Sequence, residues 1–486
     1  MWTRTIAVVS LVMLLAGSGR TAATAPTTVP ATDQAVAHAL NRLAFGARPG
    51  DVERVRSIGL QRWIDEQLAP ARGADAALAS RLDRLETLKL DSQTIQQEYS
   101  GPAMVERRQR KLENQARSEP DAATMTASPN RQRGPVNETQ PKDRKVLSDL
   151  EEAKLLRVVY SERQLEEMLV DFWFNHFNVF AGKGATRNYL AEYEREAIRP
   201  FVLGSFRDLL GATAKSPAML FYLDNWMNVA EDSPGGAGPR RPTGINENYA
   251  RELMELHTLG VDGGYSQADI VNVARAFTGW TIQPRQGSGF QFAAARHDRG
   301  EKTVLGHTIK AGGGADDGER VLDILAAHPS TARHIALKLA TRFVSDTPPQ
   351  ALVQRAAARF AATRGDLREV VRTIVTSPEF FAPEAYRAKV KTPLEFVASA
   401  LRSTGAEVRN ALPLARELRE MGMPLYFCQP PTGYDDTAAT WVSAGALVSR
   451  MNFAVALGKN EMRGVSLPRA KDDLALEIGS PEFQRR

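Results

Sequence analysis

Apolar side chains recur three and four residues apart along most of the chain, which is the spacing of one face of an α-helix. Near the N-terminus this pattern predicts helices over residues 34–45, 49–58 and 60–68, the last with Trp63 as a packing anchor. The pattern resumes at Val146, extends to Phe180 and recurs in later segments as far as Leu457. We therefore expect a mainly α fold, a multi-helix globular bundle.

Only one region has a convincing strand pattern. Residues 290–295 and 303–309 flank the turn HDRGEK, and together they predict one small β-hairpin over about residues 289–309. The turn carries His297, Asp298 and Lys302. Two interpretations stay open for it: a hairpin tip that reaches over a site, and a charged turn that faces solvent.

The densest polar pattern lies between Gly244 and Trp280, where two helical segments flank a glycine turn. One apolar stripe is formed by Ile245, Tyr249, Leu253 and Leu256. On the outer side Glu247, Arg251 and Glu255 lie four residues apart, as in an exposed ladder of ion pairs. Farther on, Ser266 and Asp269 form the capping-box pattern that starts the second helix.

Glu252 lies at the edge of that apolar stripe. A carboxylate at a core edge must be paired, bind a metal or have a raised pKa. One interpretation is a buried pair with an arginine or histidine that fixes helix packing; the other is a metal ligand or general base. The chain contains no HExxH, ExxH or Asp-rich calcium-loop motif to decide between them.

A site hypothesis follows from the helix-borne Glu and His residues. His176 shares an apolar stripe with Leu165, Leu169 and Phe172 and should point into the core, as a structural residue or as a ligand. The candidate metal ligands, for an unspecified divalent metal, are His176, Glu252, Glu255 and His257. The candidate catalytic residues are Glu252, Glu255, His257, His297 and Asp298.

The composition of the chain argues against a nucleic-acid-binding protein and against a disulfide-bonded one. The 486 residues are 43% hydrophobic and 24% charged, and the net charge of +5 is small for this length. Because the basic residues are not interleaved with aromatic ones, we expect no nucleic-acid partner. Cys428 is the only cysteine, so no intrachain disulfide forms. Its apolar surroundings, PLYFCQPP, favour a buried small side chain over a nucleophile.

The ends and the middle of the chain differ from the helical remainder. Residues 1–25 have the pattern of a signal peptide: Arg4, an apolar run from Ile6 to Ala16, then small residues around Ala23. That run is shorter than the roughly 20 residues of a membrane-spanning helix, and no later stretch reaches this length. We expect an exported protein, periplasmic or secreted, with no transmembrane segment in the mature chain and an unknown oligomeric state.

The predicted organisation has four further parts. Residues 26–91 form N-terminal helices of the core domain, and residues 146–462 form the main helical domain. Between them, residues 92–145 are rich in Gln, Arg, Glu, Ser and Pro and are expected to be a disordered polar insertion. Residues 463–486 are expected to form a frayed C-terminal tail.

Several blocks of the sequence resemble, in order, the bacterial family called domain of unknown function 1800. They are HALNRLAFGARPGDVERV, WFNHFNVF, the Gly244–Trp280 stretch, RHDRGEKTVLG, HPSTARHIALKLATRFV, KVKTPLEFV and PTGYDDTAATWVSAGALVSRMNF. The resemblance implies an exported, mainly helical protein, often encoded beside a second exported family that is a candidate partner, and it implies no established activity.

The block residues carried over are His38, Arg42, Trp173, Asn175, His176, Asn246, Glu247, Asn248, Glu252, Glu255, His257, Asp262, Trp280, His297, Asp298 and Lys302. One departure is Lys215 before Ser216 and Pro217, where the family pattern leads us to expect a histidine. That change removes one candidate metal ligand.

Two functional hypotheses remain. The first is a metal-dependent or acid–base enzyme of the envelope, in which the Glu and His residues converge between helices and the His297–Asp298 turn closes over them. The second is a non-catalytic envelope protein that binds a partner protein or a polysaccharide. Its contact surface would be formed by Trp226, Tyr265, Trp280, Tyr434 and Trp441.

Overall fold

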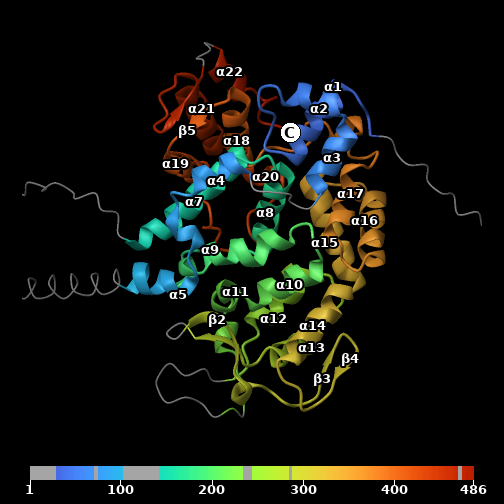
Figure 1. Cartoon of the computed structure of the whole chain (residues 1–486). Coiled ribbons are helices and arrows are strands. Elements are labelled where there is room, and N and C mark those ends of the chain that lie inside the picture. Colours follow the sequence, from blue (N-terminus) through green and yellow to red (C-terminus); the bar gives the residue numbers. More distant parts are fainter. Residues whose placement is uncertain are drawn as a thin grey trace, which may run out of the picture.

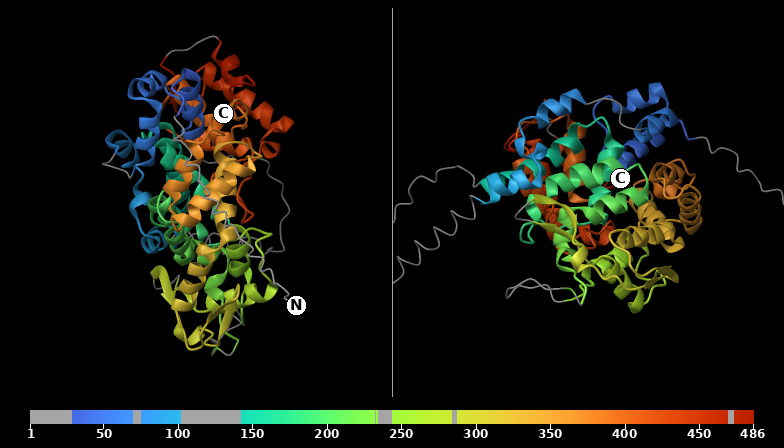
Figure 2. Two further views of the ribbon diagram at one scale, coloured as in Figure 1. Left: turned by 90° about the vertical axis from the view of Figure 1, so that its right-hand side faces the viewer. Right: turned by 60° about the horizontal axis from the view of Figure 1, so that its bottom comes forward.

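The computed structural model describes residues 29–69, 75–101, 142–231, 233, 244–283, 287–468 and 473–486. Helices account for most of these residues, and the strands form only short antiparallel pairs, so the mainly α prediction is confirmed (Figure 1). In the left view of Figure 2, the N-terminal and C-terminal helices share one end of the molecule and the β-hairpins form the opposite end. No helix among the described residues is both long and apolar enough to span a membrane.

The N-terminal helices pack against the C-terminal half of the chain. They are α1 (Asp33–Leu43), α2 (Asp51–Ile58), α3 (Leu60–Leu68), α4 (Ala76–Leu82), η1 (Glu86–Lys89), α5 (Ser92–Ile95) and the π-helical η2 (Gln96–Ser100). Trp63 is buried in the core as expected. The predicted insertion begins later than residue 92, because residues 92–100 are helical; most of it lies outside the described residues.

The middle of the chain supplies the helices around the molecular centre. They are α7 (Lys142–Tyr160), α8 (Gln164–His176), η3 (Thr186–Asn188), α9 (Leu190–Glu192), the π-helical η4 (Tyr193–Ile198), η5 (Arg199–Phe201), α10 (Phe206–Lys215), α11 (Pro217–Tyr222), η6 (Asn225–Met227), α12 (Asn248–Glu252), the π-helical η7 (Leu253–Thr258) and α13 (Gln267–Ala276). The capping box of Ser266 and Asp269 starts α13, as the sequence predicts.

The predicted single hairpin over residues 289–309 is wrong in its pairing. β1 (Trp280–Gln283) pairs with β2 (Gly287–Phe292), and β3 (Lys302–Val304) pairs with β4 (His307–Ile309), with η8 (Ala294–Arg296) between the two hairpins. Residues 290–292 of the first predicted strand lie in β2, whereas the second, residues 303–309, turns back on itself as the β3–β4 hairpin. Each pairing is with a nearer neighbour, because a short connection closes a smaller loop.

The C-terminal half is again helical. It consists of α14 (Asp316–Ala327), α15 (Pro329–Phe343), α16 (Gln350–Ala362), α17 (Leu367–Val375), η9 (Pro383–Ala385), α18 (Pro393–Thr404), α19 (Leu412–Glu420), α20 (Ala438–Trp441), α21 (Ala444–Gly458) and α22 (Leu474–Gly479), with a small pair of strands, β5 (Glu407–Val408) and β6 (Val465–Ser466).

The chain end does not fray. Arg486 is buried, and its backbone N–H donates to the carbonyl of Lys389 at 2.9 Å. Its guanidinium also forms an ion pair with the buried carboxylate of Glu395 at 2.9 Å. The prediction of a frayed tail over residues 463–486 is therefore wrong, because polar residues that looked solvated in the sequence complete a buried charge network.

Candidate functional site

Two segments that are far apart in the sequence are clamped together at the end of α8. The side-chain amide of Asn175 donates to the carbonyl of Tyr434 at 2.6 Å, and the Tyr434 N–H donates to Asn175 Oδ1 at 2.6 Å. Gly433 lies directly against this pair: a Cβ at that position would come 2.2 Å from the carbonyl oxygen of Asn175. The loop before α20 is thus held in place by the residue that precedes His176.

Three histidines from three helical elements meet beneath this clamp. The His176 ring centroid lies 6.2 Å from that of His257 in η7 and 6.1 Å from that of His334 in α15. His176 Nε2 is 3.1 Å from the carbonyl of His257, and His334 Nε2 is 3.2 Å from the carbonyl of Leu256. The other nitrogen of His176, Nδ1, and His257 Nε2 are buried without a hydrogen-bond partner among the described residues.

Lys338 lies one helical turn after His334, on the same face of α15. Its side chain lines a pocket of about 360 Å³ between α15 and the clamped loop. The other walls are Leu337, Thr341, Thr432, Gly433, Tyr434, Asp435, Asp436 and Thr437. The Lys338 amine makes no hydrogen bond or ion pair to any residue that the structure describes, although Asp436 and Asp435 are near enough to act on it electrostatically.

Burial controls the protonation of this cluster. Burial, followed by the charge of Lys338, lowers the pKa of His257 to about 3 and that of His334 to about 4, and the same two causes hold the pKa of His176 well below its ordinary value. Burial also lowers the pKa of Lys338, against the opposing effect of Asp436 and Asp435. The histidines are therefore neutral near pH 7.

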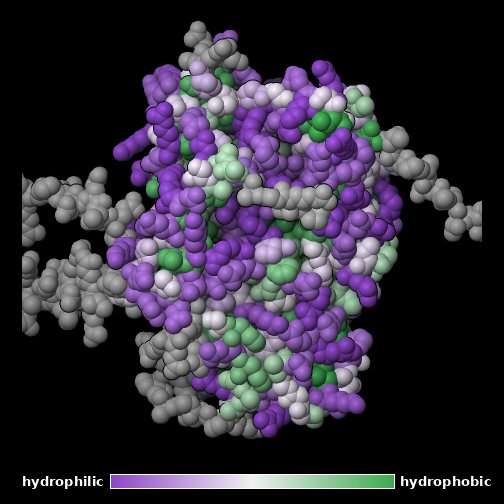
Figure 3. All heavy atoms as spheres, in the orientation of Figure 1, coloured by the Kyte–Doolittle hydropathy of each residue, from purple (hydrophilic) through white to green (hydrophobic). Residues whose placement is uncertain are grey.

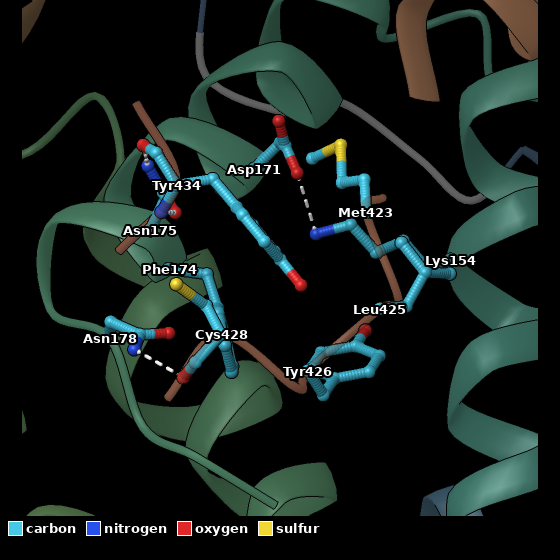
Figure 4. Close-up of a pocket in the computed structure, with 10 residues that line it drawn as sticks. All are labelled: Lys154, Asp171, Phe174, Asn175, Asn178, Met423, Leu425, Tyr426, Cys428 and Tyr434. Atoms are coloured by element: carbon cyan, nitrogen blue, oxygen red, sulfur yellow. Dashed lines mark hydrogen bonds and ion pairs between the residues drawn. The ribbon is translucent and has the colours of Figure 1, made fainter. Parts of the chain in front are cut away.

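A second, narrower pocket lies behind Tyr434. Figure 4 shows the Tyr434 ring projecting into it, with the ion pair of Lys154 and Asp171 at one side and Cys428 at the other. The Lys154–Asp171 distance is 2.8 Å, and Tyr434 donates its hydroxyl to the carbonyl of Pro424 at 2.7 Å. Burial raises the pKa of Cys428 to about 11, so its thiol stays protonated, in agreement with the prediction of a buried small side chain.

Glu252 and Glu255 occupy different settings from those histidines. Glu255 joins the predicted outer ladder, since Arg251 bridges Glu247 at 3.2 Å and Glu255 at 3.5 Å. Glu252 makes no hydrogen bond or ion pair within the described part of the chain, which contradicts the buried-pair interpretation. Burial, and then the charge of Glu255, raises the pKa of Glu252. It therefore stays a candidate proton-transfer group.

The predicted closure of His297 and Asp298 over the Glu252–His257 segment is not what the structure shows. His297 Nε2 lies 3.2 Å from the carboxylate of Asp317, and Nδ1 lies 2.8 Å from the carbonyl of Thr278. Asp298 accepts two hydrogen bonds from Arg275, at 2.8 and 3.1 Å. These bonds fasten the segment between the two hairpins to α13 and α14.

The predicted metal set does not converge. Among the residues that the structure describes, no group of three or more His, Cys, Asp or Glu side chains is arranged to hold a metal ion. His176 and His257 do meet, but their third neighbour is His334, and Glu255 is engaged by Arg251. The residues present therefore do not fit the metal centre that the sequence suggested.

Comparison with known proteins agrees with the sequence blocks. A family described as "Protein of unknown function (DUF1800)" matches residues 38–484, which is nearly the whole chain. The chain belongs to this family. No curated protein and no solved structure matches it. These comparisons therefore assign no functional residue to this DUF1800 protein.

Sequence reasoning about this DUF1800 protein found His176 and His257 but missed His334, Lys338 and the role of the loop over residues 432–437. One signal was present. His334 and Lys338 lie four residues apart in an otherwise regular helical pattern, so both point to one side of α15. Nothing in the sequence spacing indicated that this side faces the end of α8.

Proposed function

We propose that this protein is an exported acid–base enzyme whose proton-transfer group is the amine of Lys338. The observation that carries the proposal is a lysine amine in the wall of a pocket, with no hydrogen bond or ion pair in the described part of the chain, beside the buried His176 and His257 and the half-buried His334. A lysine whose pKa is lowered by burial gives up its proton more readily than an exposed lysine does, and its deprotonated amine acts as a general base.

The pocket supports a definite division of roles. In its deprotonated form, the amine of Lys338 takes a proton from a bound substrate, and the carboxylates of Asp435 and Asp436 stabilise the ammonium ion that results. Asp436 is itself fixed by an ion pair with Arg342 at 3.0 Å, so its charge is held in position. The hydroxyls of Thr341, Thr432 and Thr437 favour a small, polar, hydroxyl-bearing substrate.

The first test is the titration of Lys338 itself. Lysine amines carrying ¹³C-methyl groups from reductive methylation titrate individually by NMR, and the Lys338→Met variant assigns the resonance. We expect the pKa of Lys338 to lie below the ordinary value of a lysine amine, because burial lowers it. A Lys338 amine that titrates with the exposed lysines would overturn the proposal.

The second test is turnover. A panel of chromogenic esters, amides and glycosides is assayed with the wild type, Lys338→Met and the matched exposed variant Lys310→Met. Any activity of the wild type should fall by about 10²–10⁴-fold in Lys338→Met and persist in Lys310→Met. An activity that survives in Lys338→Met contradicts the assignment.

Export is supported by the signal-peptide pattern of residues 1–25, which lie outside the described residues. Cleavage after Ala23 or Ala25 gives a mature chain that begins at Thr24 or Pro26. N-terminal sequencing of protein from the periplasmic or culture fraction tests this. Recovery of the full-length chain from the cytosol alone would contradict it.

A second candidate function, binding of a partner protein, is favoured by one feature of α21. The side chains of Leu447, Val448, Met451 and Val455 are between 39% and 59% exposed, although hydrophilic residues cover most of the face shown in Figure 3. The aromatic surface predicted for this role is not exposed, because Trp280 and Trp441 are buried and Trp226, Tyr265 and Tyr434 are packed against the core.

Binding of the co-encoded exported protein, measured by calorimetry with wild type and the double variant Leu447→Lys/Met451→Lys, tests the second function. Loss of binding in the double variant supports a role for α21. Equal affinity for both proteins removes that role.

A further inference from the structure

The C-terminal end of the chain lies near α1 (Figure 1). A cavity of about 380 Å³ is lined by residues of α1 and by the last residue, Arg486. Its polar walls come from Gln34, His38, Asn41, Tyr386, Arg387 and Arg486. No aspartate or glutamate side chain lines it among the described residues. The cavity is separate from the pocket of Lys338, with which it shares no lining residue.

Arg42 lies one helical turn after His38, and its guanidinium forms no ion pair with any residue that the structure describes. Its side chain is completely buried, and within the described residues its one side-chain hydrogen bond goes from Nη2 to the carbonyl of Ala385 at 2.5 Å. Nε and Nη1 of Arg42 have no partner within the described part of the chain. A buried guanidinium with two free donors is strongly destabilising unless an anion or water satisfies it.

The neighbouring charges do not supply that anion. Burial, and then the charge of Arg486, lowers the pKa of Arg42 well below its ordinary value, against the opposing effect of Glu395 and Asp346. Both carboxylates already pair with other cations: Glu395 forms ion pairs with Arg342 at 3.1 Å and Arg486 at 2.9 Å, and Asp346 forms one with Lys389 at 2.5 Å. Nε of Arg486 is likewise buried without a partner in the residues that the structure describes.

We propose that this cavity binds the carboxylate or phosphate group of a small anionic ligand, held by Arg387 at the mouth and by the field of Arg42 and Arg486 behind. Arg387 is exposed and lines the cavity, so its guanidinium is available for the bidentate geometry that suits both kinds of oxyanion. Asn41 adds an amide donor in the wall.

His38 gives the site a second recognition element. Its Nε2 lies 2.8 Å from the carbonyl of Phe380, and because a carbonyl only accepts, Nε2 carries the proton. Burial, Arg42 and Arg486 lower the pKa of His38 to about 3, so the ring is neutral and Nδ1 is an acceptor. A ligand with a hydroxyl beside its anionic group matches this acceptor better than a bare anion does.

Isothermal titration calorimetry of the whole protein with inorganic phosphate and, separately, with succinate tests the proposal. We expect wild type to bind at least one of them, and the anion that binds identifies the preferred group. Arg387→Gln should weaken that binding by about tenfold or more, because it removes a charge-assisted hydrogen bond. Asn41→Asp, which places a negative charge in the wall, should abolish it.

Arg333→Gln is the matched control, since Arg333 is exposed on α15 and does not line the cavity. Its affinity for the anion should equal that of the wild type. The proposal is overturned if neither anion binds up to about 10 mM, or if Arg387→Gln and Arg333→Gln bind as wild type does. Circular dichroism of each variant confirms that the comparison is made on folded protein.

Discussion

Two lysines in this protein, the buried Lys302 and the half-buried Lys338, have opposite surroundings. Lys302, the first residue of β3, donates to the carbonyls of Asp298 and Gly300 at 2.6 and 2.9 Å and to the carboxylate of Asp317 at 2.9 Å. Lys338 makes no such bond in the described residues, and it adjoins histidines in place of a bonded carboxylate. Both sites contain lysine, histidine and aspartate, so composition alone does not distinguish them.

The difference indicates which of the two sites is functional. A lysine with all three donors satisfied is fixed as an ammonium ion and holds structure together. An unpaired lysine in a pocket wall reduces stability, and such a residue persists where a reactive amine is needed. By this criterion the Lys302–Asp317–His297 group stabilises the fold, and the Lys338 pocket is the candidate active site.

Replacing each lysine by methionine gives the largest expected contrast. Lys302→Met leaves the buried carboxylate of Asp317 without its cation, so the free energy of unfolding should fall by about 3–5 kcal/mol. Lys338→Met removes an unpaired buried amine and should leave the free energy of unfolding unchanged or raise it. Urea unfolding of both variants measures this, and a large loss for Lys338→Met would show that Lys338 has a structural partner.

The paired hydrogen bonds between Asn175 and Tyr434, which position the pocket, give the next largest expected effect. Gly433 has φ +73°, and a Cβ there would come 2.2 Å from the Asn175 carbonyl oxygen, so Gly433→Ala should lower the free energy of unfolding by about 3 kcal/mol or more. Gly422 has φ +90° but no atom within 4 Å of its Cβ position, so Gly422→Ala should cost about 1 kcal/mol. Thermal unfolding of the two variants measures the difference, which reports the close contact between position 433 and Asn175. Equal losses of unfolding free energy would show that only the backbone strain of a positive φ matters.

The histidines make stability depend on pH. Their pKa values are lower in the folded chain than in the unfolded one, so the unfolded chain binds more protons as pH falls below about 6.5. Stability is therefore lost on acidification, over the interval between about pH 6.5 and the folded values of about 3 to 4. A buried histidine should contribute about 2 kcal/mol of this loss at pH 5.

His257→Phe tests this contribution, since it removes one titrating ring and keeps the volume. The loss of unfolding free energy between pH 7 and pH 5 should be smaller in this variant by about 2 kcal/mol. His307→Gln, at an exposed position in β4, should behave as the wild type. Identical pH profiles for wild type and His257→Phe would contradict the account of neutral buried histidines.

The helical period predicted the fold class, because apolar spacing reports local geometry directly. It also predicted the capping box of Ser266 and Asp269 and the ion-pair ladder through Arg251, whose partners lie within a helical turn or so. The candidate metal ligands were not predicted correctly as a set, because their positions depend on contacts between segments that are far apart in the sequence. His176, His257 and His334 are brought together by packing between helices, and no spacing along the chain encodes that contact.

The structure of the chain end also depends on a contact that local sequence spacing does not predict. Arg486 looked solvated because it lies in a polar segment, but its partner Glu395 is far away in the sequence. In the same way, Asp317 decides the role of His297 and lies beyond the hairpin to which His297 was assigned. Buried charge pairs of this kind are invisible until the fold is known, and they decide which polar residues remain free for chemistry.

Glu252 and Glu255 give the smallest and most discriminating contrast. Among the residues that the structure describes, Glu252 has no hydrogen-bond or ion-pair partner, and its pKa is raised, so at pH 7 its ionised form reduces stability. Glu252→Gln should therefore raise the free energy of unfolding by about a few tenths of a kcal/mol. Because a raised folded pKa lowers stability as pH rises, this gain should vanish below about pH 4.5, where the unfolded group is protonated too. Glu255→Gln loses the ion pair with Arg251 and should lower stability by a similar amount.

Urea unfolding at pH 7 and pH 4 measures both glutamate variants. If the two variants change the free energy of unfolding in opposite directions at pH 7, Glu252 resembles Lys338, which has no bonded partner among the described residues. Glu255 then resembles Lys302, which has one. If Glu252→Gln instead destabilises the protein by more than about 1 kcal/mol, Glu252 has a partner in solution, and the contrast between paired and unpaired sites does not extend to η7 and its flanks.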